Sequence, residues 1–135
     1  MTRADVTGAV LEAAQAASDK KARDILILDV SDQLVITDHF LICSGTSDRQ
    51  VRTIAEEVER RLLDARGLKP YRREGAREGR WVLLDYVDFV VHVFDQQERD
   101  YYELERLWSD APVVPFESSS ANQREHDERT AAEAT

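Results

Sequence analysis

The sequence predicts a single α/β domain, in which a mixed sheet of about five strands is flanked by helices. Two observations carry this prediction. Segments with helical periodicity alternate with short aliphatic runs, in the order helix, two strands, helix, three strands, helix. The chain has 135 residues, 42% hydrophobic and 33% charged, which suits one hydrophobic core in a globular protein. We expect this domain to span residues 1–116.

Apolar periodicity over residues 5–17 predicts a first amphipathic helix. The aliphatic run DILILDV at 24–30 predicts a short buried strand, because its length is too small for a helix. A connector with polar ends follows, and HFLICSG at 39–45 predicts a second strand that closes at Gly45.

Residues 46–67 predict a second amphipathic helix. Thr46 or Ser47 can cap its amino end, since a hydroxyl oxygen accepts a hydrogen bond from a free backbone N–H there. Gly67 suits the left-handed residue that closes a helix, and Pro70 prevents its continuation.

The segment PYRREGAREGR at 70–80 predicts a short strand followed by an exposed loop. Residues 81–95 then predict two strands joined by a bend at DYVD, 85–88. Residues 98–108 predict a last helix with one apolar side, formed by Tyr101, Leu104, Leu107 and Trp108.

The chain after residue 108 changes character. Two prolines make SDAPVVPF extended. The stretch 117–135 has no aromatic or β-branched aliphatic side chain, so it cannot offset its ordering entropy, and we predict a disordered acidic tail.

Charge and composition exclude several classes of function. The net charge of −9 argues against a direct grip on nucleic acid and is compatible with a basic protein partner. No apolar run predicts a membrane span, and the amino terminus does not resemble a signal peptide, so we expect a cytoplasmic protein. A single cysteine, Cys43, excludes an intramolecular disulfide and a multi-cysteine zinc site, and we interpret it as a small core residue.

The turn SGTSDRQ at 44–50 could hold a phosphate at a helix start, but we favour a capped helix, because neither a G-x-G-x-x-G nor a Walker pattern is present. A nucleotidyltransferase would also need a carboxylate pair one residue apart, whereas Asp85 and Asp88 are three apart. His92 lacks a nearby nucleophile or metal, so we interpret it as a hydrogen-bonded strand histidine. No catalytic residue, cofactor or metal is expected.

In WVLLD, strand alternation places Trp81, Leu83 and Asp85 on one face and Val82 and Leu84 on the other. If the second face is the core, Trp81 is free to anchor a binding partner. Packing of Trp81 beneath a helix is the alternative, and spacing alone does not separate the two.

Several spaced blocks resemble the ribosomal silencing factor S family, also called Iojap-like. They are LDV at 28–30, TD at 37–38, SGTS at 44–47, the segment 81–88, and VHVF at 91–94, followed by matches up to about residue 110. One departure is Val87, where the family usually has glycine.

The resemblance implies a protein that is not an enzyme. Family members bind ribosomal protein fourteen of the large ribosomal subunit, block association with the small subunit and repress translation during starvation or stationary phase. The family fold resembles that of nucleotidyltransferases without their active site, and some members form homodimers.

By position in the motif, the resemblance implies that Trp81, Asp85 and Asp88 bind the partner, and we add Leu83 and Tyr86 from their places in the strand. Two alternatives stay open. One is a large-subunit assembly factor that uses the same contact. The other is a nucleotide-binding enzyme of the nucleotidyltransferase type.

Overall fold

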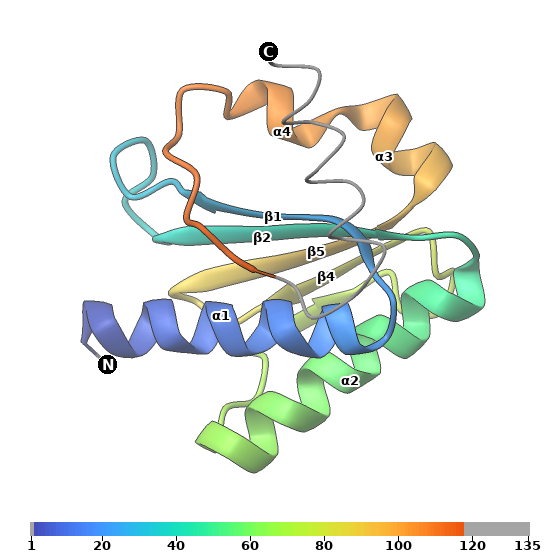
Figure 1. Ribbon diagram of the computed structural model, residues 1–135, viewed down its shortest axis with the longest axis horizontal. Coiled ribbons are helices and arrows are strands. Elements are labelled where there is room, and N and C mark those ends of the chain that lie inside the picture. Colours follow the sequence, from blue (N-terminus) through green and yellow to red (C-terminus); the bar gives the residue numbers. More distant parts are fainter. Residues whose placement is uncertain (1, 118–135) are drawn as a thin grey trace.

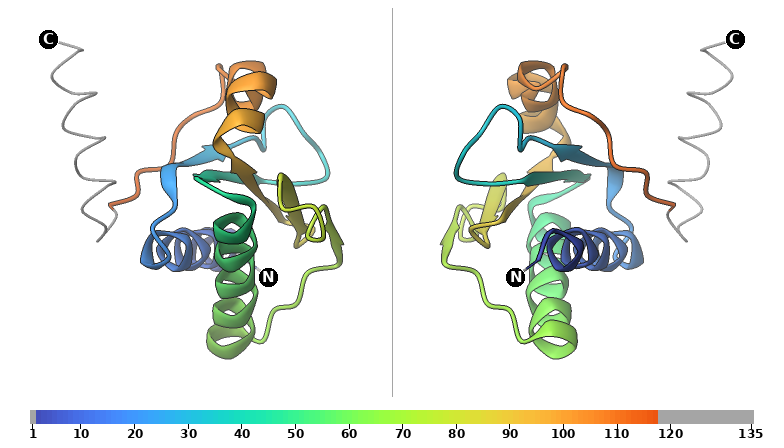
Figure 2. Two further views of the ribbon diagram at one scale, coloured as in Figure 1. Left: turned by 90° about the vertical axis from the view of Figure 1, so that its right-hand side faces the viewer. Right: turned by 90° about the vertical axis from the view of Figure 1, so that its left-hand side faces the viewer.

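The computed structural model describes residues 2–117, which form one five-stranded mixed sheet with helices on both faces (Figures 1 and 2). The α/β architecture predicted from the sequence is confirmed. The disordered tail predicted from residue 117 onward falls, apart from Glu117, outside the described residues.

The sheet has the strand order β1-β2-β5-β4-β3. Its strands are β1 (Arg23–Asp29), β2 (His39–Gly45), β3 (Arg72–Glu74), β4 (Trp81–Asp85) and β5 (Phe89–Asp95). The pair β2–β5 is parallel and the other three pairs are antiparallel. One end of the sheet, which we call the Gly45 end, is therefore where β2 and β5 finish and β1 and β4 begin. The opposite Phe89 end is where β2 and β5 begin.

Two long helices, α1 (Arg3–Asp19) and α2 (Asp48–Arg66), cover one face of the sheet (Figure 2). The hydroxyl of Ser47 accepts the backbone N–H of Gln50 at 3.1 Å and so caps α2, as predicted. Gly67 ends this helix with φ of 65°, a left-handed conformation that costs little without a Cβ atom.

The main core lies between these helices and the sheet. Alternate residues of β4 contribute to it, so Val82 and Leu84 are fully buried while their neighbours are half-buried. Cys43 is also fully buried there, and desolvation raises the pKa of its thiol to about 12. Its predicted role as a small core residue is confirmed.

The opposite face is covered over β1, β2, part of β5 and the start of β4, by α3 (Gln96–Tyr102), α4 (Leu104–Leu107) and the chain that follows (Figure 1). The buried guanidinium of Arg99 secures α3 to the sheet. Its Nη1 donates to the carbonyl oxygen of Asp24 at 2.6 Å and to the hydroxyl of Ser44 at 2.9 Å.

The single helix predicted over residues 98–108 is wrong, because Glu103 breaks it with φ of 47°. The break changes the direction of the chain, so the expected apolar side does not form. Tyr101 and Leu107 are 80% and 76% exposed. Trp108 packs edge-to-face on Phe40, with 5.2 Å between ring centroids.

The segment after α4 is extended, as predicted, and lies along the outer edge of β1. The backbone N–H of Asp29 donates to the carbonyl of Pro112 at 2.8 Å, and that of Val114 donates to Ile27 at 2.9 Å. This pairing covers an edge that would otherwise be open to another chain. None of the helices in residues 2–117 is long and apolar enough to span a bilayer.

Candidate functional site

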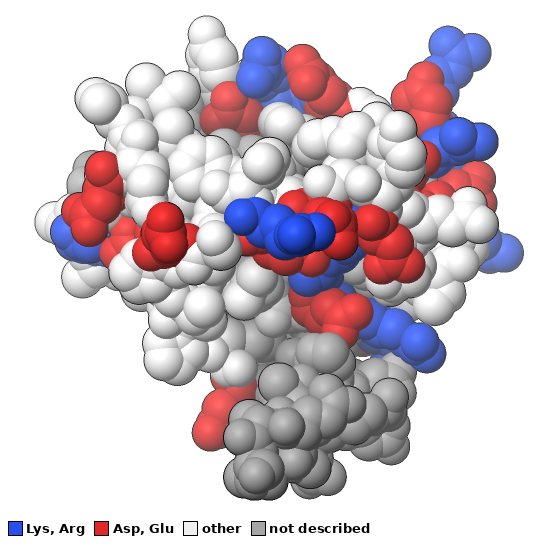
Figure 3. Space-filling view, turned by 90° about the horizontal axis from the view of Figure 1, so that it is seen from above, with Lys and Arg blue, Asp and Glu red and all other residues white. Residues whose placement is uncertain are grey.

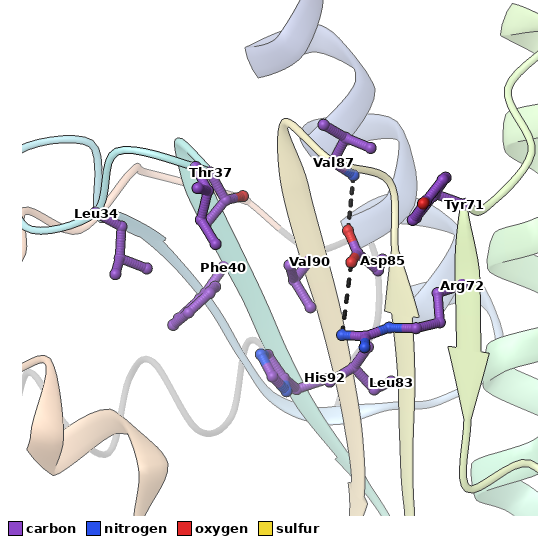
Figure 4. A pocket seen from close by; sticks show the side chains of 11 residues that line it. Leu34, Thr37, Phe40, Tyr71, Arg72, Leu83, Asp85, Val87, Val90 and His92 are labelled. Atoms are coloured by element: carbon purple, nitrogen blue, oxygen red, sulfur yellow. Dashed lines mark hydrogen bonds and ion pairs between the residues drawn. The ribbon is translucent and has the colours of Figure 1, made fainter.

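A groove of about 390 Å³ opens on the half-covered face of the sheet, at its Phe89 end (Figure 4). Its walls come from the connector between β1 and β2, from the chain that enters β3, and from the bend between β4 and β5. Leu83, Phe40 and Val90 line it from the sheet itself. The lining is therefore almost entirely apolar, and few polar groups are available inside.

Exposed apolar side chains surround the groove. Ile36 is 80% exposed, Tyr71 is 81% exposed and Val87 is 52% exposed, and all three line it. Val35, next to Ile36, is fully exposed. Large apolar side chains gathered around a concave surface are typical of a protein-binding site, because their burial on binding releases ordered water.

The carboxylate of Asp85 is the acidic group in the groove. It accepts the backbone N–H of Val87 at 2.8 Å and forms an ion pair with Arg72 at 3.8 Å (Figure 4). The hydrogen bond to Val87 stabilises the bend. The ion pair places the Arg72 guanidinium beside the Asp85 carboxylate in the groove wall. Asp88 is half-buried at the bend, and its carboxylate forms no ion pair within residues 2–117.

Val87 occupies the bend in a left-handed conformation, with φ of 72°. The bend closes through the backbone, since the N–H of Tyr86 donates to the carbonyl of Phe89 at 2.9 Å. The bend predicted at 85–88 is thus confirmed with valine in place of glycine. A β-branched side chain is strained in this conformation, and the Val87 side chain lines the groove wall.

Trp81 lies on the same face of β4 as Leu83 and Asp85, as predicted, but beyond the groove toward the Gly45 end. Its ring is half-buried, because it stacks on Phe94 with 4.7 Å between centroids and lies under Tyr102 at 5.1 Å. Both sequence alternatives are thus partly right: Trp81 is on the face of β4 opposite to Val82 and Leu84, and a helix partly covers it.

His92 connects Trp81 to the groove. Its Nδ1 accepts the indole N–H of Trp81 at 3.2 Å, and the same side chain lines the groove (Figure 4). Desolvation lowers the pKa of His92 to about 4, so the ring is neutral near pH 7. The hydrogen bond predicted for His92 is present at Nδ1, whereas Nε2 is buried without a partner among the described residues.

Tyr86 does not share this surface. Its ring is buried on the opposite face of the sheet, stacked on Phe89 with 4.9 Å between centroids. The structure thus brings Leu83 and Asp85 together in the groove, leaves Trp81 and Asp88 outside its lining, and places Tyr86 on the opposite face of the sheet.

Sequence reasoning missed several groove residues, among them Ile36, Phe40 and Tyr71 outside the hairpin and Val90 within it. One signal was available, because Val35 and Ile36 are apolar residues in a connector that fits no helix or strand pattern. Tyr71 had no such signal, since only the fold brings it beside the bend.

The turn at Gly45 serves the helix cap. The Oε1 atom of Gln50 accepts hydrogen bonds from the backbone N–H and from the hydroxyl of Thr46, at 2.6 and 2.8 Å. These two donors are therefore already used and are not free to bind a phosphate. Within residues 2–117, no three His, Cys, Asp or Glu side chains are grouped closely enough to hold a metal ion.

Comparison with known proteins agrees with the resemblance seen in the sequence. The family described as "Ribosomal silencing factor during starvation" matches residues 3–135. The ribosomal silencing factor RsfS of Bacillus subtilis is 49% identical over 105 residues, which cover 78% of this chain and 88% of that protein.

Two more distant similarities extend this result. A mouse protein named "Mitochondrial assembly of ribosomal large subunit protein 1" is 32% identical over 67% of this chain and 40% of its own length. A crystal structure of a Chromobacterium violaceum protein superposes with a TM-score of 0.74 at 34% identity, covering 90% of this chain and 97% of that one. The chain therefore belongs to the ribosomal silencing factor family, in agreement with the expectation that it is not an enzyme.

Proposed function

We propose that this protein binds ribosomal protein fourteen on the large ribosomal subunit through the groove, and that it thereby blocks association with the small subunit. Repression of translation in starvation or stationary phase follows from such a block. The proposal places the protein in the cytoplasm, where the subunits join.

The observation that carries the proposal is the ring of exposed apolar side chains around a groove with little polar lining. Ile36 and Tyr71 supply apolar area that a monomeric protein rarely exposes together. Asp85 and Asp88 lie in and beside the groove and can face basic groups of the partner, which favours encounter more than final affinity. Leu83 and His92 line the groove, and Trp81 holds the His92 ring in place through a hydrogen bond to its Nδ1.

Co-sedimentation with purified subunits tests the proposal. We expect the wild type to travel with large subunits and to reduce the fraction of joined ribosomes. Ile36→Asp places a charge on the rim and should strongly reduce both effects, while Leu107→Asp changes a similarly exposed apolar residue on α4 and should reduce neither. Equal loss in both variants, or no loss in either, would contradict a contact through the groove.

An assembly role is a second candidate, favoured by the similarity to the mouse protein whose name refers to assembly of the large subunit. Depletion of the protein separates the two. Immature large subunits would accumulate if the protein acts in assembly, whereas normal subunits with poor survival of starvation would support silencing. Self-association, which the resemblance also implies, stays a prediction that light scattering can test.

A further inference from the structure

The Gly45 end of the sheet carries a group of exposed basic side chains, which we call the basic end. Strand register brings together the starts of β1 and β4 and the start of α2 there. Its members are Lys20, Lys21, Arg23, Arg49, Arg77 and Arg80. Seen from above, Lys and Arg gather toward this end of the molecule, with carboxylates among them (Figure 3).

Direct contacts confirm that these segments are neighbours. The side-chain amide of Gln50 donates to the carbonyl oxygens of Lys20 and Lys21, both at 3.2 Å. On the other side of α2, Nη1 of Arg52 donates to the carbonyl of Arg77 at 3.4 Å. The first turn of α2 therefore links the end of α1 to the loop between β3 and β4.

The cations of the basic end form no ion pairs with the described residues. Most other Lys and Arg side chains of the described residues form ion pairs. Among residues 2–117, seven form none, and six of these are the members of the basic end, the seventh being Lys69.

Carboxylates at the same end are fewer. Asp48 is paired with Arg52 at 3.3 Å. Five other carboxylates lie at this end, namely Asp24, Glu78, Asp95 and, in the first turns of α3, Glu98 and Asp100, against the six cations. The whole chain has a net charge of −9, so this end, where cations slightly outnumber carboxylates, lacks the negative excess of the rest of the protein. The sequence argument against nucleic acid used only the net charge of the whole chain, which does not show that charge is distributed unevenly between the two ends of the sheet.

We propose that the basic end binds phosphate groups of the large-subunit ribosomal RNA, as a second contact beside the groove. The inference rests on the proposed function for the identity of the target and goes beyond it in naming RNA as a partner. Arginine presents a planar set of donors that matches a phosphate group, and lysine adds a mobile point charge. The positive end of the α2 dipole lies at the same place.

Phosphate fits the basic end better than a protein surface does. None of the exposed large apolar side chains of the described residues lies in the segments 20–24, 45–52 or 75–80. A protein interface needs such side chains at its centre, whereas a phosphate backbone is bound by charge and hydrogen bonds alone.

The position of the basic end also has a consequence for orientation. It lies at the end of the sheet opposite to the groove, and the acidic remainder of the protein is repelled by RNA. Attraction at one end and repulsion elsewhere orient the protein before it docks, and two separate contacts then hold that orientation.

The test is the salt dependence of binding to purified large subunits. Arg49, Arg77 and Arg80 are changed together to glutamine in one variant. In the matched control, Arg60, Lys69 and Arg106 are changed to glutamine, which alters the net charge equally at other places. Affinities are measured over a range of potassium chloride concentrations, and thermal melting confirms that both variants are folded.

Each phosphate contact contributes about 0.7–0.9 to the slope of log affinity against log salt concentration. We expect the basic-end variant to lose about two units of slope and at least about tenfold in affinity at low salt, and the control to keep the wild-type slope. An unchanged slope in the basic-end variant overturns the proposal. So does an equal loss in the control, because it would show an effect of net charge alone.

The groove contact and the RNA contact can be overturned independently of each other. Ile36→Asp should lower affinity at every salt concentration and leave the slope unchanged. If Ile36→Asp binds normally while the basic-end variant loses slope, the groove contact is wrong and the RNA contact stands. The reverse pattern overturns only the RNA contact, and a wild type that does not bind large subunits overturns both.

Discussion

The indole N–H of Trp81 donates a hydrogen bond to Nδ1 of His92 on the neighbouring strand, with 3.2 Å between the two nitrogens. This bond requires an unprotonated Nδ1, so it persists only while the imidazole is neutral. It consumes the one polar atom of the Trp81 side chain. A partner can therefore meet Trp81 only through its apolar surface.

The stability of the protein should decrease in mild acid because of His92. Burial lowers its pKa from 6.5 to about 4, so between these values the unfolded chain binds a proton that the folded protein does not. The stabilisation is full above pH 6.5 and falls as the pH approaches 4, by about 3 kcal/mol in total. Urea unfolding at pH 7, 5.5 and 4.5 measures this loss.

His39 titrates in the same direction, since desolvation also lowers its pKa. The control is therefore His92→Gln, in which only the contribution of His92 is absent and the loss between pH 7 and 4.5 should be smaller. A pKa near 6.5 for His92, measured by NMR in the folded protein, would contradict the prediction.

Trp81→Phe should destabilise the fold by about 1–3 kcal/mol, because it leaves Nδ1 of His92 buried without a donor. The stacking on Phe94 is largely kept, so secondary structure should not change. Trp81→Ala removes both the bond and the stacking and should cost more, about 3–5 kcal/mol. Denaturant unfolding followed by circular dichroism gives both values.

Trp81→Ala also removes the hydrogen bond to His92, which lines the groove. A loss of subunit binding in this variant would therefore not distinguish a direct contact of Trp81 from a disturbed groove. Binding by Trp81→Phe at a temperature where it is folded is the informative comparison. If Phe and Ala at this position are equally stable, the hydrogen bond contributes nothing and the prediction fails.

Val87→Gly should stabilise the free protein. Valine at φ of 72° is strained by roughly 1–2 kcal/mol, and glycine relieves this at the cost of a more flexible unfolded chain, so we expect a net gain of about 1 kcal/mol. Val35→Gly is the matched control, because Val35 is fully exposed and has no positive φ. Thermal melting of the two variants side by side should show a rise only for Val87→Gly.

Tyr71→Ala should weaken binding to large subunits by about tenfold or more, as the loss of an aromatic contact at the centre of an interface commonly does. Tyr101→Ala removes the same side chain from an equally exposed position on α3, outside the groove, and should bind like the wild type. A sedimentation titration with each variant measures the difference. Equal affinities for the two variants would count against Tyr71 as part of the contact.

The sequence predicted most of the elements because their signals are local. The α2 boundaries followed from Ser47 and Gly67, whose cap roles depend on residues three or four positions away. Strand alternation likewise placed Trp81, Leu83 and Asp85 on one face of β4. The helix break at Glu103 had no local signal, since glutamate favours helices and only packing against the sheet places it in a left-handed conformation.

The sequence by itself determined the family, most of the strands and helices, and which residues of β4 share a face, because periodicity and short motifs depend on neighbouring residues. Only the tertiary structure decided which side chains share the groove, that Tyr86 leaves it for the core, and that six basic residues from three segments meet at the Gly45 end. The physical reason is that these relationships join positions far apart in the chain. They depend on the register of the strands and on the packing of α2 against them, which no local pattern specifies.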